Sequence, residues 1–455
     1  MTKAIVLREL LDAILSRKLL WITVLCCLPI PLCTLVNQHT LLQFAAYQAR
    51  AEADYGKSLT GMVPADQIEV RAFRPKPALA ALAFGLESVL PNMVLLRRDG
   101  MSVGQGQSQE NPVINLFGRI DLLFMVRFVL SLAAIVLTFG AICGEKELGT
   151  LSLIFSGPVP RDSVLLGKYL AASIILIVPF LFSLLLTVLL MQFQGSGVLA
   201  SGEAWMRILC IFFLCMLYLM AFMGLGILVS SSTSRPLVAI TVLLFLWAGL
   251  VVVLPQSAGL LSEQLLPVES TESFLFKKNL LAQELDRKRA AELEPFLNDP
   301  NYDAIRAPIA MKYSVELTKA EAEMDQDYSN QRRAQFRLAS ALASLSPVTP
   351  LTVGVTAVAG TGVPQSDQFI SAIDRFQAEV NDKVFSQGYR DVFPGGRASL
   401  QVNLLALKDI PRFELTALPL NVLLRKIAAP VGLLILANAV LFVFAYLRFL
   451  HYEVT

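Results

Sequence analysis

Long apolar stretches dominate the hydropathy pattern of this chain of 455 residues. A helix that crosses the hydrocarbon core of a bilayer needs about 20 predominantly apolar residues. Six stretches approach or exceed that length, and two of the polar segments between them are long. The pattern predicts a mainly α-helical, polytopic membrane protein with six transmembrane helices, at residues 19–37, 121–143, 169–192, 205–230, 237–254 and 427–447.

The two long polar segments, 38–120 and 255–426, are each long enough to fold outside the bilayer. The second contains two runs rich in Ala, Glu, Leu, Lys and Arg, separated by the turn-like stretch NDPNYD. This composition favours two long helices folded back as a hairpin. In the first segment PNMVLLRRDG is a candidate strand and VGQGQSQENP a loop. We expect two extracytoplasmic domains, the second with a helical hairpin.

Residues 1–18 carry a second kind of apolar pattern. Apolar side chains fall mostly on one face of a helix, with charged side chains opposite, as in a helix that lies in the membrane interface. The alternative is a first span that starts earlier, but charges interrupt the apolar run. No small-residue cleavage pattern follows the first span, which we interpret as an uncleaved anchor. The apolar face comprises Ile5, Leu7, Leu10, Leu11, Ile14 and Leu15.

Basic residues set the expected orientation. They occur in the N-terminal arm and in the loop at 144–168, whereas the loop at 193–204 has no Lys or Arg. By the positive-inside rule, the arm, the loop at 144–168 and the tail at 448–455 lie in the cytoplasm. The basic residues in question are Lys3, Arg8, Arg17, Lys18, Lys146, Arg161 and Lys168.

Composition and charge agree with a membrane location. Hydrophobic residues make up 55% of the chain and charged residues 16%, beyond what a soluble domain carries. The net charge of +2 does not indicate a nucleic-acid partner. The six cysteines lie in or beside apolar runs, and there are only two histidines. We therefore expect no disulfide framework, no metal site and no catalytic residues of the chain's own.

Two motif matches test for enzymatic chemistry. The stretch GMSVG places Ser102 in the pattern of a nucleophile elbow, but that motif needs a helix after the serine, and QGQSQENP cannot form one. Gly167 and Lys168 lack the earlier glycine of a phosphate-binding loop. A hydrolase that uses Ser102 is thus the weakest hypothesis, and ATP and magnesium are expected on a partner chain only.

Polar residues and prolines inside the spans leave alternatives open. Arg127 and Asn438 are possible intramembrane functional sites, because buried polar groups in a membrane mark function by default. Arg127 could instead extend to the headgroups, and Asn438 could join two helices. Pro29 and Pro31 should bend the first span.

The charged insert between the second and third spans has a pattern of its own. EKELGTLSLIFS can form a short helix with an apolar side, SGPVPR ends it, and DSVLLGKYL starts the third span. We predict a helix lying flat at the cytoplasmic surface, held on both sides by transmembrane helices.

This insert resembles the signature of permease subunits of ABC exporters of the second type. In that family an acidic pair leads into Gly-Thr-Leu, a Ser-x-Pro-Val, a basic residue and a Gly-Lys at the next span. The matching residues are Gly144, Glu145, Glu147, Gly149, Thr150, Leu151, Ser156, Pro158, Val159, Arg161, Gly167 and Lys168.

The resemblance implies a role for the insert. In the family the flat helix is a coupling helix that docks into a cleft of a separate ATPase subunit. By that resemblance the contact surface is Glu145, Lys146, Glu147, Gly149, Thr150, Leu151, Ile154, Phe155 and Arg161. We expect the apolar members of this set to contribute more to docking than salt bridges, which at a solvated surface are worth under about 1 kcal/mol.

The stretch LSPVTPLTVGVTAVAGTG and the final span resemble a permease subfamily with large outside domains. The chain departs from simpler members, because about 170 residues replace the short connection between the fifth and sixth spans. The resemblance implies an exporter in a bacterial inner membrane, with a second permease subunit and two ATPase copies. The alternative is a mechanotransmitter that acts on a periplasmic partner through residues 255–426 and transports nothing.

Overall fold

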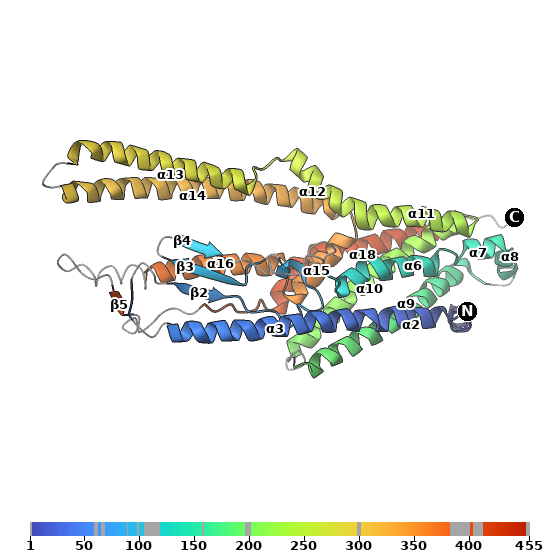
Figure 1. Ribbon diagram of the computed structural model, residues 1–455. Helices are drawn as coiled ribbons and strands as arrows, with labels where there is room; N and C mark the ends of the chain where they lie inside the picture. Colours follow the sequence, from blue (N-terminus) through green and yellow to red (C-terminus); the bar gives the residue numbers. More distant parts are fainter. Residues whose placement is uncertain are drawn as a thin grey trace. The chain divides into compact units, whose positions relative to one another are not determined.

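A computed structural model gives the fold of this protein. The described chain is mainly helical, with two small antiparallel sheets, and it divides into two compact units, residues 1–251 with 347–455 and residues 252–346 (Figure 1). The structure describes residues 2–58, 62–64, 69–88, 90–97, 100–103, 119–156, 159–195, 202–297, 302–382, 401–403 and 413–451.

Six helices are long and apolar enough to cross a membrane. Their number and their approximate positions confirm the six predicted spans. Each is longer than the apolar stretch that predicted it, because polar residues at its ends continue the helix. The six are Lys18–Tyr55, Leu122–Glu147, Arg161–Phe193, Gly202–Ser232, Pro236–Leu265 and Leu420–Leu450.

Helix α10 (Gly202–Ser232) lies at the centre of the first unit. It contacts α6 (Ser131–Thr138), α9 (Arg161–Phe193), α15 (Val348–Ala359) and α18 (Leu420–Leu450). Many of its side chains are therefore buried, among them Tyr218 and Phe222. Helix α11 (Pro236–Ala248), which continues through η5 (Gly249–Val253), is largely exposed in this single chain. Its apolar side chains face outward, as expected for contact with lipid or a second subunit.

The N-terminal arm is a separate helix, as its pattern predicts. Helix α1 (Thr2–Leu15) ends before Arg17, whose φ of 59° lies in the left-handed region and interrupts the helix. Helix α2 (Lys18–Cys27) then ends at Leu28, and α3 (Pro29–Ser58) follows. The break immediately before Pro29 fits the missing N–H and fixed φ of proline. On α1, Leu7, Leu11, Ile14 and Leu15 are exposed.

The second span is interrupted twice, by a π-type stretch and by a turn. A short α5 (Leu122–Phe124) leads into η3 (Met125–Leu130), where the helix widens to π-type hydrogen bonding, and then into α6. After a turn at 139–142 the chain continues as α7 (Cys143–Glu147) and α8 (Thr150–Phe155). A polar contact from α10 compensates the break at the turn, because Ser230 Oγ accepts hydrogen bonds from the N–H groups of Ile142 and Cys143.

Both described chain ends lie at the α7–α8 end of the bundle (Figure 1). Helix α1 contacts the start of α9, and Arg161, also at the start of α9, donates to the carbonyl of Leu450 at the end of α18. This agrees with an even number of spans. The side of the membrane that this end faces stays a prediction.

At the opposite end, parts of both long polar segments share one core. The three-stranded sheet has the order β2–β3–β4, with β2 (Val70–Phe73), β3 (Met93–Arg97) and β4 (Gly100–Val103) antiparallel. Helix α16 (Val363–Val380) packs Phe369, Ile373, Phe376 and Val380 against it. The β3 strand confirms the strand predicted in PNMVLLRRDG. The second sheet pairs β1 (Met62–Pro64) with β5 (Gln401–Asn403).

This shared core corrects the predicted boundaries of the two outside domains. Residues 38–120 and 255–426 are not two independent domains, because the apolar faces of β2 and β3 are covered by α16 from the second segment. The turn between α15 and α16 also contacts the first segment, and Thr361 Oγ1 donates to the carbonyl of Ala83. Hydropathy along the chain does not reveal which segment buries the face of another, so this pairing was missed.

Residues 252–346 form the predicted helical hairpin. Helix α13 (Thr271–Leu293) runs antiparallel to α14 (Tyr302–Ala343), and Lys312 with Glu292 and Lys278 with Asp325 join them as ion pairs. The connecting turn at 298–301 lies outside the described residues, as does most of the predicted loop after Val103. Helix α12 (Leu254–Leu265) packs on α14, and η6 (Glu294–Phe296) ends α13.

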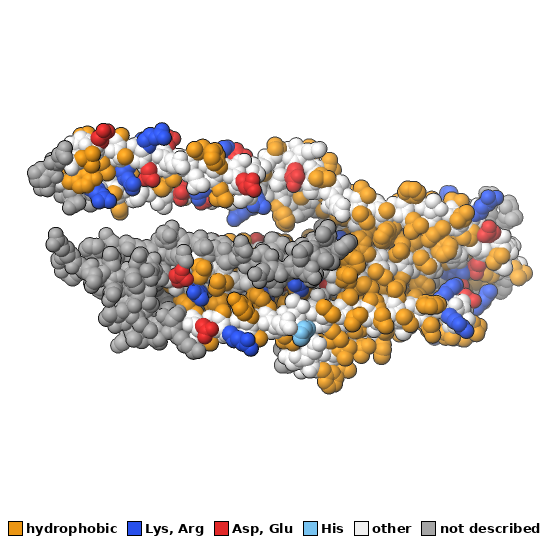
Figure 2. Space-filling view, in the orientation of Figure 1, with side chains coloured by type: hydrophobic (Ala, Val, Ile, Leu, Met, Phe, Trp, Pro, Cys, Tyr) orange, Lys and Arg blue, Asp and Glu red, His pale blue; other side chains and the backbone are white. Residues whose placement is uncertain are grey.

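The surface of the bundle is strongly apolar. Figure 2 shows hydrophobic side chains over the long helices and charged side chains at the α7–α8 end. Leu237 and Phe245 on α11 are each 77% exposed. A soluble surface rarely carries apolar patches of this extent, so the distribution supports a multi-pass membrane protein.

Candidate functional site

The insert at 143–156, here called the elbow, consists of two short helices. Gly149 has a φ of 68° and lies between α7 and α8. A left-handed residue ends one helix and lets the chain turn into another, and glycine adopts this conformation without steric cost. The expected single helix over EKELGTLSLIFS is therefore wrong, because the stretch forms two short helices, with α8 at Thr150–Phe155.

The apolar side of α8 faces the bundle. Leu151 is 2% exposed and packs in a cluster with Ile142, Val164, Leu165, Ile227, Ala445 and Phe449. Ile154 and Phe155 pack against the same cluster. The expectation that Leu151 docks on a partner is thus corrected, whereas Ile154 and Phe155 are half-buried and their contact with a partner stays a prediction. Burying a leucine of this kind contributes about 1.5–3 kcal/mol to the fold, which anchors α8 on α9 and α18.

Other elbow residues face outward. Leu148 is 77% exposed and Leu153 is 74% exposed. Glu147 and Thr150 are exposed beside them. The outward face of the elbow, defined here by Glu147, Leu148, Thr150 and Leu153, combines two large apolar side chains with one carboxylate. Exposed apolar side chains beside polar groups are typical of interaction surfaces.

A buried lysine joins three helices at the base of the elbow. Lys168 Nζ on α9 lies 2.8 Å from Glu145 on α7 and 2.7 Å from Glu9 on α1, and its side chain is 6% exposed. Gly167 allows α1 to approach, because a Cβ at this position would lie 2.8 Å from the side chain of Ile5. Glu145, expected at the partner surface, is therefore engaged within the chain.

Two further cations hold the elbow on neighbouring spans. Lys146 Nζ donates to the carbonyls of Ser231 at 2.5 Å and Thr233 at 3.2 Å, at the end of α10. Arg161 donates to the carbonyl of Leu450 at 2.6 Å and lies over the ring of Phe155. Cations at helix C-termini are favourable because the terminal carbonyls carry partial negative charge. The elbow is thus fixed to α9, α10 and α18.

Comparison with known proteins identifies the family. The sequence model of the ABC-2 family transporter proteins matches residues 3–454, which is nearly the whole chain. This chain belongs to the ABC-2 transporter family. It is also similar to the probable ABC transporter permease protein NosY of Pseudomonas aeruginosa, with 30% identity over 151 residues, or 31% of this chain. The match spans about half (54%) of that relative.

Family membership makes the chain a membrane permease component of an ABC transporter and supports the predicted permease identity. It also agrees with a chain that does not itself catalyse a reaction. In this ABC-2 permease Ser102 lies within β4, paired with Leu95 of β3 in an antiparallel sheet. A nucleophile elbow instead needs a parallel strand that turns into a helix, and β4 is not such a strand.

The two predicted intramembrane sites of the ABC-2 permease both contact the middle of α10, at the neighbouring residues Leu217 and Tyr218. Asn438 Nδ2 donates to the carbonyl of Leu217 on α10, at 2.9 Å. Asn438 therefore joins two helices, which was one of the two roles that its position suggested. Arg127 lies in η3, one and a half turns into the second span, and its guanidinium lies 5.2 Å from the ring centre of Phe128. Tyr218 donates to the backbone carbonyl of Arg127.

Sequence reasoning missed several residues of the elbow region. Ser230 contacts the elbow from α10, and Glu9 on α1 contacts Lys168, the partner of Glu145. No local pattern indicates such contacts. Leu153 could have been found, since it lies two residues after Leu151 and thus on the opposite side of a helix. Leu148 could not, because a spacing of three residues would place it on the same face as Leu151, and the break at Gly149 changes which side it faces. Gly157 and Pro158 lie outside the described residues.

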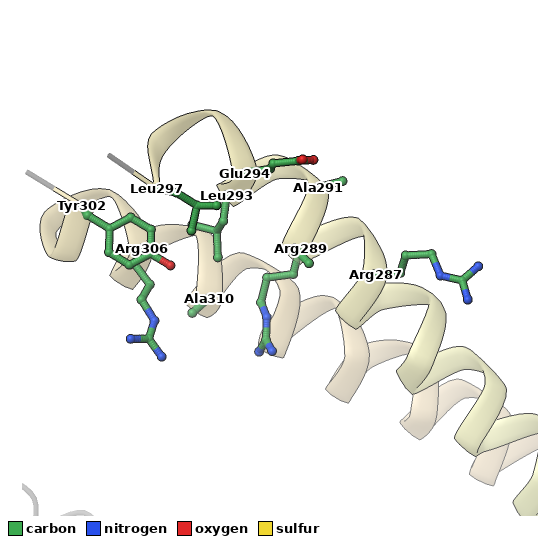
Figure 3. A pocket seen from close by; sticks show the side chains of 10 residues that line it. Arg287, Arg289, Ala291, Leu293, Glu294, Leu297, Tyr302, Arg306 and Ala310 are labelled. Carbon is green, nitrogen blue, oxygen red and sulfur yellow. The ribbon is translucent and has the colours of Figure 1, made fainter. Parts of the chain in front are cut away.

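The hairpin of the permease carries a groove at its tip, of about 780 Å³. Figure 3 shows Leu293, Leu297 and Tyr302 close together there, whereas the side chain of Arg287 points away from them. Residues 298–301, which connect the two helices in sequence, lie outside the described residues. A contact with an external partner through this region therefore stays a prediction.

Proposed function

We propose that this chain is the permease half of an ATP-driven exporter, and that the outward face of the elbow docks on a separate ATPase subunit. The observation that supports this best is the combination of exposed Leu148 and Leu153 with firm attachment of the elbow to three spans. A surface fixed in this way passes a displacement on to the helices, because packed interiors deform little.

The mechanism uses two permease chains and two ATPase chains. Binding of ATP with magnesium closes the ATPase dimer, which displaces both elbows and tilts the spans attached to them. The transporter then alternates between two states whose populations depend on the nucleotide. In this proposal the α7–α8 end faces the cytoplasm of a bacterium and the spans cross its inner membrane.

Co-purification tests the docking surface. Full-length protein is extracted from its native membranes in mild detergent, together with a double variant, Leu148→Asp and Leu153→Asp. The wild type should recover an ATPase with a phosphate-binding loop, and the variant should not. Leu345→Asp is the matched control, since Leu345 is 71% exposed and lies in the other unit. Equal recovery with the double variant would place the docking surface elsewhere.

A second candidate function is mechanotransmission without transport. Helix α3 is continuous for 30 residues from Pro29. Near its end, the hydroxyl of Tyr55 contacts the start of β2, where it donates to the carbonyl of Glu69 and accepts from the N–H of Arg71. Displacement of a span would thus reach the sheet directly. Substrate-dependent stimulation of the partner ATPase favours export. A protein bound outside the bilayer, with no such stimulation, favours mechanotransmission.

A further inference from the structure

A cavity of about 350 Å³ lies at the end of the bundle opposite the elbow. It is lined by residues 74–79, the start of α10, the α15–α16 turn with the first turns of α16, and residues 415–418. The first two turns of one candidate span, α10, and the residues just before another, α18, thus meet there. Its volume is in the range of small-molecule sites.

The wall of this cavity, here called the boundary cavity, is mainly apolar. Its carbon surface comes from Pro75, Pro77, Ala78, Leu79, Phe369 and Leu415. Three cationic side chains interrupt it: Arg74 and Lys76 from the first long polar segment and Arg207 from α10. Their side chains are only 5%, 7% and 13% exposed, respectively. An apolar wall with a few convergent charged groups is typical of ligand sites.

The three cations use only some of their N–H donors in hydrogen bonds with the described residues. Arg74 uses three of the five N–H groups of a guanidinium, two on Glu87 and one on the carbonyl of Pro91. Lys76 uses two of three, on Glu87 and Asn92. Arg207 uses four of five, on Glu203, Val358 and Leu418. Within the described residues, each cation therefore has at least one N–H donor without an acceptor.

The charge balance points the same way. Among the described residues that line this cavity or pair with its cations, three cations face two carboxylates, Glu87 and Glu203, which leaves one positive charge. Both oxygens of Glu87 already accept hydrogen bonds, and one oxygen of Glu203 accepts from Arg207 and from the N–H of Leu420. The site thus offers surplus donors and a surplus positive charge beside an apolar wall.

We infer that the boundary cavity binds an anionic amphiphile, whose phosphate or carboxylate head contacts Arg74, Lys76 and Arg207 and whose apolar chain lies on the carbon wall. The ligand is either an anionic lipid of the bilayer or an exported compound of the same chemistry. Oxyanions form strong charge-assisted bonds with guanidinium and ammonium groups. This inference goes beyond the proposed export function and does not depend on the elbow.

Photolabelling of the purified full-length permease, without an ATPase, tests the inference. The probe is dodecyl phosphate with a diazirine in its chain, and a dodecyl glycoside with the same diazirine is the uncharged counterpart. We expect label on residues 74–79, 203–207 and 415–418 with the phosphate probe. Unlabelled dodecyl phosphate should compete, and inorganic phosphate should compete poorly because it lacks the chain.

Two variants keep the test decisive. Lys76→Met retains the apolar stem and should lower labelling about tenfold through the lost charge-assisted bond. Ala417→Trp fills the cavity mouth from an exposed position and should abolish labelling even if the first variant folds poorly. Lys312→Met, in the hairpin, is the matched control. Labelling that neither variant changes, or equal labelling by the uncharged probe, would overturn the inference.

A separate experiment identifies the source of the ligand. Mass spectrometry of the permease from native membranes should find an anionic phospholipid, or another anionic amphiphile, that Ala417→Trp loses. A phospholipid would make the cavity a lipid site, and another anionic amphiphile would make it a site for an exported compound. If the wild type and Ala417→Trp carry the same amphiphiles, the cavity is not their site. Because no ATPase is present, failure here differs from failure of the elbow co-purification.

Discussion

Buried charges determine the local geometry at both ends of this permease. Near the elbow Lys168 lies between two carboxylates, Glu9 and Glu145. At the other end Glu87 accepts from Arg74 and Lys76 with an exposed fraction of zero for its side chain. Removing one partner of such a group leaves an uncompensated buried charge, which is strongly destabilising. Replacing the whole pair with apolar residues changes the free energy of unfolding much less.

Replacing Lys168 with Met should destabilise the elbow. Two carboxylates would then lose their common cation, and breaking a buried pair costs about 3–5 kcal/mol, reduced here to about 2 kcal/mol because Glu9 is one-third exposed. A lower Tm in detergent, with faster hydrogen exchange of α1, checks this. Lys288→Met, which removes only an exposed pair with Glu284, should leave both unchanged. An unchanged Tm in the first variant would mean that α1 is held by apolar contacts alone.

The sheet at the far end should be labile to acid. Burial disfavours the charged form of Glu87, but hydrogen bonds from Arg74 and the charge of Lys76 outweigh it and hold the pKa of Glu87 below its ordinary value of 4.5. Because the folded pKa is the lower one, the stabilisation is complete above pH 4.5 and is lost as the pH falls through the folded value. Hydrogen exchange in β2 and β3 between pH 3 and 6 measures it.

The control for this pH dependence is the hairpin. Its exposed pair of Glu292 and Lys312 contributes little to stability, so α13 and α14 should show no comparable loss of protection at acid pH. Equal loss in the sheet and the hairpin would point to general acid unfolding and not to Glu87.

At the scale of helices, interruptions define the functional surfaces. Gly149 separates α7 from α8, Arg17 separates α1 from α2, and η3 widens the second span. Long apolar stretches predicted the six spans well, because hydropathy is a local property of the chain. The break at Gly149 rests on the left-handed conformation of that residue. Because the sequence reading continued one helix across this glycine, it assigned Leu151 to the wrong surface.

The contact between α6 and α10 should depend on Gly226. A Cβ there would lie 1.9 Å from Thr138 Oγ1. Gly226→Ala gains about 1 kcal/mol of helix propensity, but the overlap is too large for that gain to offset, and we expect a lower Tm with a net loss of about 1–3 kcal/mol. Thermal denaturation in detergent measures it.

Two companion variants make this prediction specific. Gly224→Ala is the matched control, since its Cβ would meet only Leu441 at an ordinary 3.5 Å, and it should be neutral or stabilising. Adding Thr138→Ala to Gly226→Ala removes the nearest atom and should restore part of the loss, with the Thr138 Cβ still 2.9 Å away. No difference between the two glycine variants would contradict the close approach.

Across the whole molecule, long-range pairing was the part that the sequence did not reveal. The number of spans, the N-terminal helix, the strand at Met93–Arg97 and the hairpin follow from local patterns. The core shared by β2, β3 and α16 joins positions about 300 residues apart, and the contact of Glu9 with Lys168 joins positions 159 apart. Such contacts need complementary surfaces, and a single sequence records only each surface alone.

The division into two units gives the last prediction. Residues 252–346 form a compact unit of their own, and the elbow, the spans attached to it and the sheet belong to the other. Deletion of 283–320, with a short Gly-Ser turn joining Ala282 to Glu321, keeps the ion pair of Lys278 with Asp325. The Tm of the remaining protein and recovery of the ATPase should therefore match the wild type.

If substrate still stimulates the ATPase after the deletion, that result supports export. Such stimulation is not expected if the hairpin passes the motion to an external partner. Loss of ATPase recovery would show that the two units depend on each other.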